Sequence, residues 1–291
     1  MTSEPPLSAR YLVIGLPEAG KTTFLAALWH IADTGDVPGA LRAPRDVADQ
    51  QHLNAIRDRW LTVEPTPRTR RGAEKRVSML LEKDDKTSIE VLFPDMSGES
   101  FLEHWKHRAW PASYQEMVQN ASGLLVFIHP EKLIPSPRID EGNAALKALE
   151  ALDPGRPATL PKPESVEEAL WDPERSPTEV VLVDLLQFVD TARTRVSPLP
   201  VAVVISAWDR IEAENVQPSS WLATHLPLLN QFLETNEDRY EWRVFGVSAQ
   251  GGDPVNDAQR LRAMRPLERI KVVGSGASDH DITAPIRWLI R

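Results

Sequence analysis

The chain has 291 residues, 42% of them hydrophobic, with a formal net charge of −9 at pH 7 and no cysteine. No basic stripe offsets this acidity, which argues against a primary nucleic-acid binder, and the lack of cysteine excludes disulfide scaffolds and thiolate metal sites. No apolar run approaches the ~20 residues that cross a bilayer, and the first residues lack a signal-peptide pattern. We expect a cytoplasmic globular protein.

The first predicted element is a buried strand over residues 11–14, followed directly by a glycine-rich loop and then by a helix from residue 23. The loop reads GLPEAGKT over residues 15–22 and fits the pattern G-x-x-x-x-G-K-[ST]. In this pattern the backbone amides turn toward phosphate oxygens at a helix N-terminus, whereas an ordinary glycine turn has no such context. The predicted phosphate-binding residues are Gly15, Pro17, Glu18, Ala19, Gly20, Lys21, Thr22 and Thr23. Lys21 is expected to lie across the β- and γ-phosphates, and the Thr22 hydroxyl to hold Mg²⁺.

Strands and helices alternate along the rest of the chain. The predicted strands cover residues 76–82 and 88–93, joined as a hairpin, and then 123–128, 201–205 and 242–247. The predicted helices cover residues 47–61, 113–120, 179–193, 221–233 and 283–291. This alternation indicates a mostly parallel sheet with both faces covered.

Residues 131–177 interrupt the alternation with a proline-rich stretch. We interpret residues 1–291 as a single domain that carries this stretch as an insertion between a core strand and the next helix. The insertion is either an element that binds a partner or covers the site, or a tolerated surface insertion.

A second motif, D-x-x-G, follows the predicted strand 88–93. Open α/β sheets bind ligands at the carboxyl ends of their strands, where Asp95 and Gly98 would stand. Asp95 would hold Mg²⁺, and the Gly98 amide would contact the γ-phosphate. A plain turn is the alternative.

Two further motifs suit recognition of a purine base. Residues 206–209 read SAWD after the strand 201–205, and the Asp209 carboxylate can accept hydrogen bonds from N1 and N2 of guanine, which adenine cannot supply. Residues 248–250 read SAQ after the strand 242–247, and the Ala249 amide can donate to guanine O6, with Ser248 beside it.

The order GLPEAGKT, DMSG, SAWD, SAQ resembles the Ras-like small GTPase domain of the translation-factor-related class, and most of all bacterial double-GTPase proteins from multi-gene systems linked to conflict or defence. The resemblance extends over residues 9–291 apart from the insertion. It implies an α/β fold in three layers, with a mostly parallel six-stranded sheet, one antiparallel strand and helices on both faces. It also implies GTP/GDP and Mg²⁺ as ligands and a nucleotide-driven switch near Thr69 and Gly98.

The chain departs from that family pattern at three places. Ser206 and Ala207 replace the usual Asn-Lys before Asp209, so Trp208 either packs along the base or is a buried structural residue. Glu99 follows D-x-x-G where glutamine is common. It is either a base for hydrolysis, a source of repulsion that slows hydrolysis, or an exposed side chain. The switch threonine that holds Mg²⁺ has no clear motif, and Thr69 is favoured over Thr66.

These residues lead to two hypotheses of different classes. In the first, the protein is a switch that binds GTP and hydrolyses it slowly, with Lys21, Gly98 and Glu99 at the reacting phosphate. A partner protein, such as another GTPase, would read or activate it. In the second, it is an interaction module that binds nucleotide without turnover. An ATPase or kinase fits less well, because Asp209 and the Ser248-Ala249 pair suit guanine.

Two histidines on the segment after D-x-x-G could also contact a metal. His104 and His107 are three residues apart, but no further ligand accompanies them in the sequence. A solvated helix face is therefore the favoured interpretation of this pair.

Overall fold

The computed structural model describes residues 9–44, 50–65, 76–94, 98–137, 172–194 and 197–290. Within these ranges the chain forms a seven-stranded sheet in the order β2-β3-β1-β4-β5-β6-β7. The strands are β1 (Ala9–Gly15), β2 (Val77–Glu82), β3 (Ser88–Phe93), β4 (Gly123–Ile128), β5 (Leu199–Ser206), β6 (Tyr240–Ser248) and β7 (Lys271–Val273). The five central strands are parallel, and the edge strands β2 and β7 each run antiparallel to their neighbour.

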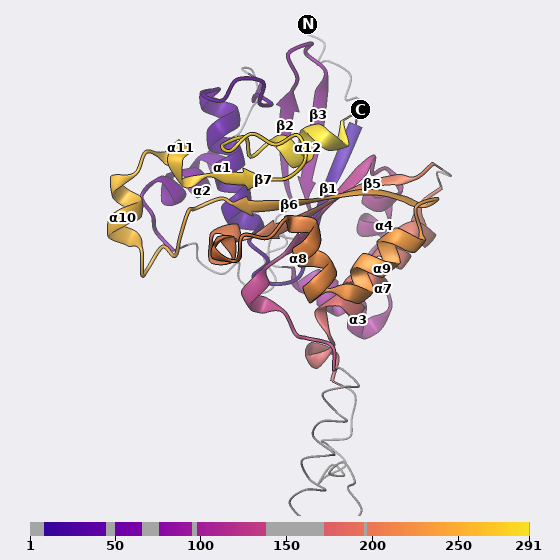
Figure 1. Ribbon diagram of the computed structural model, residues 1–291. Coiled ribbons are helices and arrows are strands. Elements are labelled where there is room, and N and C mark those ends of the chain that lie inside the picture. The colour runs from indigo at the N-terminus through magenta and orange to yellow at the C-terminus, as the bar shows by residue number, and fades with distance from the viewer. Residues whose placement is uncertain are drawn as a thin grey trace, which may run out of the picture.

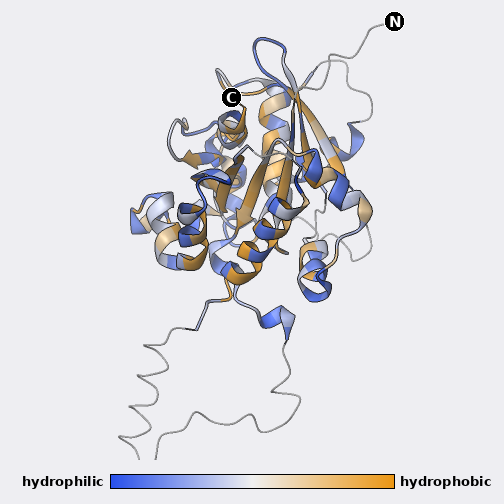
Figure 2. Ribbon diagram, turned by 90° about the vertical axis from the view of Figure 1, so that its right-hand side faces the viewer, coloured by the Kyte–Doolittle hydropathy of each residue, from blue (hydrophilic) through white to orange (hydrophobic). Residues whose placement is uncertain are grey.

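Helices cover both faces of the sheet, because alternate residues of the central strands are buried on opposite sides. In β1, Tyr11 and Val13 pack in one apolar cluster with α1 (Lys21–Thr34) and α2 (Gln51–Leu61). Leu12 and Ile14 pack in the other, with the helices of the opposite layer. Figure 1 shows α1 and α2 on one side of the sheet and α7, α8 and α9 on the other. In Figure 2 the strands between the layers are mostly hydrophobic, whereas the helices also carry hydrophilic residues. Strands buried on both faces are typical of parallel sheets.

The second layer contains α3 (Glu99–His107), α4 (Ala112–Gln119), α7 (Thr178–Ala192), α8 (Pro218–His225) and α9 (Pro227–Thr235). Near the carboxyl end of the chain lie α10 (Ala258–Ala263), α11 (Pro266–Arg269) and α12 (Ala284–Leu289). Short 3₁₀ turns are η1 (Pro130–Lys132), η2 (Pro173–Arg175), η3 (Trp208–Arg210) and η4 (Glu212–Glu214). Within the described ranges, every helix is too short or too polar to cross a bilayer.

The three-layer α/β fold and the β2–β3 hairpin are confirmed, but two details of the prediction are wrong. The sheet has seven strands, because the short strand β7 adds an antiparallel edge beside β6. The helix expected over residues 221–233 is two helices, since proline at residue 227 cannot continue α8, and Leu226 before it leaves the helical conformation at φ −133° and ψ 59°.

The two ends of the predicted insertion lie side by side. The Ile134 N–H donates to the Thr178 hydroxyl at 2.9 Å, and the Thr178 N–H donates to the Ile134 carbonyl at 2.9 Å. The η2 turn also contacts α3, where Lys106 pairs with Glu174 at 2.9 Å. Residues 138–171, which form most of the insertion, lie outside the described residues.

Candidate functional site

The loop between β1 and α1 is wound by two residues in the left-handed region, Glu18 at φ +60° and Gly20 at φ +86°. Gly20 also has no room for a side chain, because a Cβ there would lie 2.9 Å from the Cβ and Oγ of Ser206. Gly20 is the N-cap of α1, and no side chain caps this helix. Uncapped N–H groups and the helix dipole favour an anion at this end of α1, where Thr22 and Thr23 form the first turn.

Lys21 is 2% exposed and lies against the loop that precedes it. Its ammonium donates to the Gly15 carbonyl at 2.7 Å and to the Leu16 carbonyl at 3.0 Å. A buried ammonium is costly unless acceptors surround it, so the two carbonyls fix the charge at the mouth of the loop. The loop therefore combines amide donors with a fixed positive charge, as a polyphosphate requires.

The start of α3 touches the same loop. Gly98 is the uncapped N-cap of α3 at φ +79°, where a Cβ would come within 2.6 Å of the Gly15 oxygen and 2.7 Å of Lys21 Nζ. Glu99, the first residue of α3, is partly exposed. The D-x-x-G glycine and the Lys21 ammonium are thus in contact distance, so a group bound at Lys21 also faces the start of α3.

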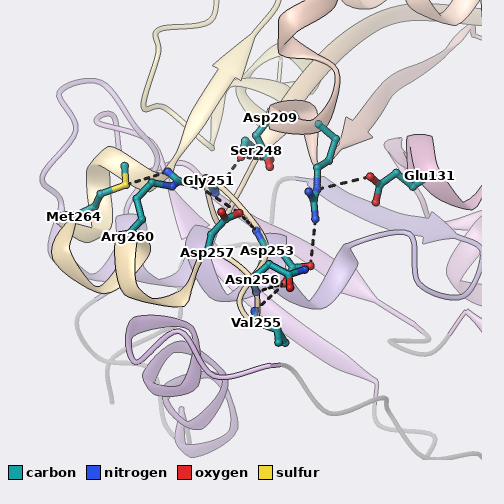
Figure 3. Close-up of polar contacts among 11 residues, drawn as sticks. Glu131, Asp209, Ser248, Gly251, Asp253, Val255, Asn256, Asp257, Arg260 and Met264 are labelled. Atoms are coloured by element: carbon teal, nitrogen blue, oxygen red, sulfur yellow. Dashed lines mark hydrogen bonds and ion pairs between the residues drawn. The ribbon is translucent and has the colours of Figure 1, made fainter.

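The predicted base-reading residues also come together. Ser248, which is 1% exposed at the end of β6, donates its hydroxyl to Asp209 Oδ1 at 2.5 Å, and accepts the Gly251 N–H at 3.1 Å. Figure 3 shows this contact between Asp209 and Ser248 beside the loop that holds Gly251. One carboxylate oxygen of Asp209 is therefore oriented by Ser248.

A cavity of about 300 Å³ joins these two halves. Its lining includes Gly20 and Thr23 from the phosphate loop, Asp209 from SAWD and Ala249 from SAQ. It lies at the carboxyl ends of parallel strands, where open α/β sheets bind ligands. Its volume is within the range of small-molecule sites.

Charged side chains form the rim of this cavity. Lys132 in η1 pairs with Glu18 of the phosphate loop at 2.6 Å. Its neighbour Glu131 pairs with Arg210 at 3.8 Å, and Arg210 pairs with Asp253 at 3.2 Å. Figure 3 shows Glu131 and Asp253, the two carboxylates of these pairs, at the mouth of the site. These pairs connect the loop after β4 to the loops that follow β1, β5 and β6.

Two titratable groups of the rim have shifted pKa values. Burial lowers the pKa of His129, whose Nδ1 accepts the Glu131 N–H at 3.2 Å. The backbone N–H groups of Asn256 and Val255 bond to Asp253 and lower the pKa of its carboxyl. Both shifts keep His129 neutral and Asp253 ionised near neutral pH.

Trp208 does not face the cavity. It is 2% exposed and packs on β6, where a Cβ on Gly246 would lie 2.2 Å from its Cδ2. Of the two roles considered for Trp208, the structure therefore supports the buried structural one. Ala207 beside it has φ +46° and carries no charge. The amino groups near the phosphate loop come instead from Lys21 and Lys132.

The interpretation of His104 as part of a solvated helix face is wrong. His104 is 2% exposed, with its ring centroid 4.1 Å from that of Phe188 and 4.8 Å from that of Trp110. Burial lowers the pKa of His104, which leaves a neutral ring in an aromatic cluster. His107 is exposed and lies 3.2 Å from Glu103. Phe188 lies on α7 and is distant in sequence, so the local pattern around His104 could not show that the ring is buried.

Three of the predicted magnesium residues lie outside the described residues, namely Asp95 and the alternative threonines Thr66 and Thr69. Thr22, in the first turn of α1, is described. The Thr22 hydroxyl at the start of α1 is an oxygen donor of the kind that Mg²⁺ prefers.

Sequence reasoning missed several residues of the site, including Lys132, Arg210 and Trp60. Lys132 and Arg210 each follow a strand by four residues, but nothing in their local pattern marks them as rim residues. Trp60 comes from the predicted helix 47–61 and lines the cavity although it is far from every motif. Only tertiary contacts reveal these three side chains.

Three solved structures illustrate the chain's structural similarities. The Arl6 BBS3 small GTPase from Trypanosoma brucei, with a bound nucleotide analogue, aligns at TM-score 0.39 and 10% identity over 97% of this chain and 95% of its own. The Ski7 GTPase-like domain from S. cerevisiae aligns at 0.46 and 11% over 98% and 50%. The signal recognition particle receptor SRb of Chaetomium thermophilum aligns at 0.38 and 16% over 89% and 98%.

Comparison with family models identifies the family of the chain more directly than the solved structures do. No protein of curated function matches the chain. The family model of double-GTPase 1 matches residues 12–289, which is most of the sequence. The chain therefore belongs to the double-GTPase 1 family.

Proposed function

We propose that this member of the double-GTPase 1 family is a guanine-nucleotide switch that binds GTP and GDP with Mg²⁺ and hydrolyses GTP slowly. The observation that carries the proposal is the cavity of about 300 Å³, because Gly20 and Thr23 of the phosphate loop line it together with Asp209 and Ala249. A ligand that fills both halves must carry a polyphosphate at one end and a base with N–H donors at the other.

Each predicted residue then has a role. The amides of the loop from Gly15 to Thr22 and the Lys21 ammonium bind the phosphates. Thr22 and Asp95 hold Mg²⁺, with Thr69 as the third ligand in the triphosphate state. Mg²⁺ neutralises charge on the β- and γ-phosphates when bound. Asp209 accepts from the base N–H groups, and the Ala249 amide donates to guanine O6.

Slow hydrolysis follows from Glu99. This carboxylate begins α3 beside Gly98, whose backbone lies against Lys21 and the phosphate loop. A carboxylate next to the γ-phosphate repels the negative charge that the phosphate oxygens carry in the transition state, and this repulsion slows the reaction. We propose that a partner protein, such as another GTPase, supplies an activating group or reads the bound state. The proposed setting is the cytoplasm of a bacterium, within a multi-gene system.

The second candidate is an interaction module that binds nucleotide without turnover. Ser206 and Ala207 favour it, because they replace the Asn-Lys pair of the family pattern and Ala207 brings no charge to the cavity rim. In this candidate the Mg²⁺-nucleotide stabilises the surface that a partner recognises.

Two measurements separate these candidates. Thermal unfolding with GTP, GDP, ATP and ADP in Mg²⁺ tests the guanine assignment, since a ligand at 100 times its Kd stabilises the fold by about 2.7 kcal/mol. We expect stabilisation by GTP and GDP, whereas equal stabilisation by ATP would overturn the guanine assignment. Single-turnover hydrolysis of GTP then distinguishes a slow GTPase, with a measurable rate for the protein alone, from a module without turnover.

A further inference from the structure

The loop that carries Ala249 is held by α2, a helix that belongs to none of the motifs. Trp60, in the last turn of α2, is 3% exposed, and its indole N–H donates to the Ala249 carbonyl at 2.9 Å. This bond is buried and joins residues 189 positions apart in the chain. It therefore fixes the backbone of Ala249 against the α1–α2 layer.

Trp60 is in turn fixed by a buried cation. Arg269, the last residue of α11, is 4% exposed, and its guanidinium lies 5.6 Å from the Trp60 ring centroid. It donates to the carbonyls of Trp60 at 3.2 Å and Leu61 at 3.1 Å. These carbonyls end α2, where a helix dipole favours positive charge. Arg269 thus caps the helix that carries the indole.

The same loop is also anchored on its inner side. The Ser248 hydroxyl bonds to Asp209 and to the Gly251 N–H, as described above. On the outer side, a Cβ on Gly251 would lie 2.8 Å from the Arg269 carbonyl, so the loop passes directly along the Arg269 backbone. Residues 248–251 are therefore held between Asp209 on one side and the Trp60–Arg269 pair on the other.

We infer that Trp60 is a positioning residue for base recognition, which holds Ala249 so that its amide donates to guanine O6, and that Arg269 holds Trp60 in place. This inference rests on the proposed function. An amide that reads a base must keep its direction before the base arrives, because ordering a loop during binding reduces affinity. Without the indole N–H, the buried Ala249 carbonyl loses its partner and the loop can relax to recover one.

The test uses Trp60→Phe, which keeps an aromatic ring and removes the indole N–H together with the five-membered ring that carries it. Trp29→Phe is the matched control, because Trp29 is also buried and its indole N–H donates to Asn54 at 2.9 Å, away from the base loop. Calorimetric titration of both variants and of the unaltered protein with GDP, IDP and ADP gives three Kd values for each.

Loss of the O6 contact predicts a specific pattern. Trp60→Phe should raise the Kd values of GDP and IDP by the same factor of about ten, which is the equivalent of one hydrogen bond. ADP has no oxygen at position 6, so its Kd should not change. The ratio of the GDP and IDP constants should also stay constant, because Asp209 reads the 2-amino group that inosine lacks. Trp29→Phe should change no Kd by more than about twofold.

Other outcomes identify which idea fails. If Trp60→Phe and Trp29→Phe behave alike while the unaltered protein prefers GDP to ADP, the inference is wrong and the proposed function stands. If Trp60→Phe weakens ADP binding as much as GDP binding, Trp60 has only a general structural role. If the unaltered protein does not prefer GDP to ADP, both ideas fail. If Trp60→Phe does not fold, Arg269→Lys provides a second variant. It should raise the Kd values of GDP and IDP about threefold.

Discussion

The two halves of the site are built in different ways. The phosphate half is mainly local, since one loop of eight residues supplies most of it and Gly98 adds one contact from the start of α3, and glycine conformations are its main requirement. The base half is assembled from segments far apart in the chain, which include Trp60, Asp209 and Ser248. A motif can therefore describe the first half almost completely, whereas the second depends on tertiary contacts that no short pattern records.

The largest expected effect tests the phosphate half. Lys21→Ala removes a buried ammonium that would contact two phosphates, and hydrogen bonds to charged groups contribute about 1.5–3 kcal/mol each. We expect GDP and GTP affinities to fall about a thousandfold, measured by calorimetry. GDP binding within tenfold of the unaltered protein would contradict the assignment of this half.

A smaller effect is expected in the base half. Asp209→Asn keeps the shape but replaces one acceptor oxygen by an amide donor that faces the base N–H groups. We expect the GDP affinity to fall about a hundredfold, because an unmatched buried polar group loses its partner. ADP binding should change little, and the ratio of GDP to ADP affinities is the measurement. An unchanged ratio would mean that Asp209 does not read the base.

The rim pair between the two halves should have a modest effect. Lys132→Met removes the positive charge that pairs with the Glu18 carboxylate beside the phosphates, and we expect GTP to bind about fivefold more weakly at low salt. The double variant Glu18→Gln/Lys132→Met should recover most of the affinity, because both charges are gone. Equal Kd values for the single and double variants would show that the pair is merely an exposed ion pair, which contributes little.

The smallest expected effect is a pH dependence of stability. Burial lowers the pKa of His30, His104 and His129 in the folded protein below the ordinary value of 6.5. The unfolded chain therefore binds more protons as the pH falls through about 6.5, and the free energy of unfolding decreases. Urea denaturation between pH 7.5 and 5.5, roughly spanning that value, should show this decrease. His129→Gln should make the decrease smaller, and a curve that is flat in the unaltered protein would contradict it.

The fold shows the same division between local and distant information. The hairpin and the buried strands β4 and β5 could be predicted, because continuous apolar runs and turn residues specify them locally. Strand β7 could not, since three residues carry too little pattern and its pairing with β6 depends on the whole sheet. His104 was misjudged for the same reason, because the aromatic rings around it include Phe188 on α7.

In the site, the prediction succeeded where backbone geometry requires particular residues. Gly20 and Gly98 have left-handed conformations and no room for a Cβ, so their identity is visible in the sequence. Trp60 and Arg269 could not be found in this way, because tryptophan and arginine occur at many helix ends without contacting a functional loop. Their importance depends on one buried hydrogen bond and on the capping of α2.

The central claim is that a single ligand occupies both halves of the cavity, with phosphates at Lys21 and a guanine base at Asp209. Displacement of a fluorescent GDP analogue by unlabelled GDP, ADP and inorganic pyrophosphate, in Mg²⁺ buffer, tests it most directly. The account predicts that GDP displaces the analogue at far lower concentrations than either ADP or pyrophosphate, because only GDP fills both halves. Displacement by ADP as effective as displacement by GDP would contradict it.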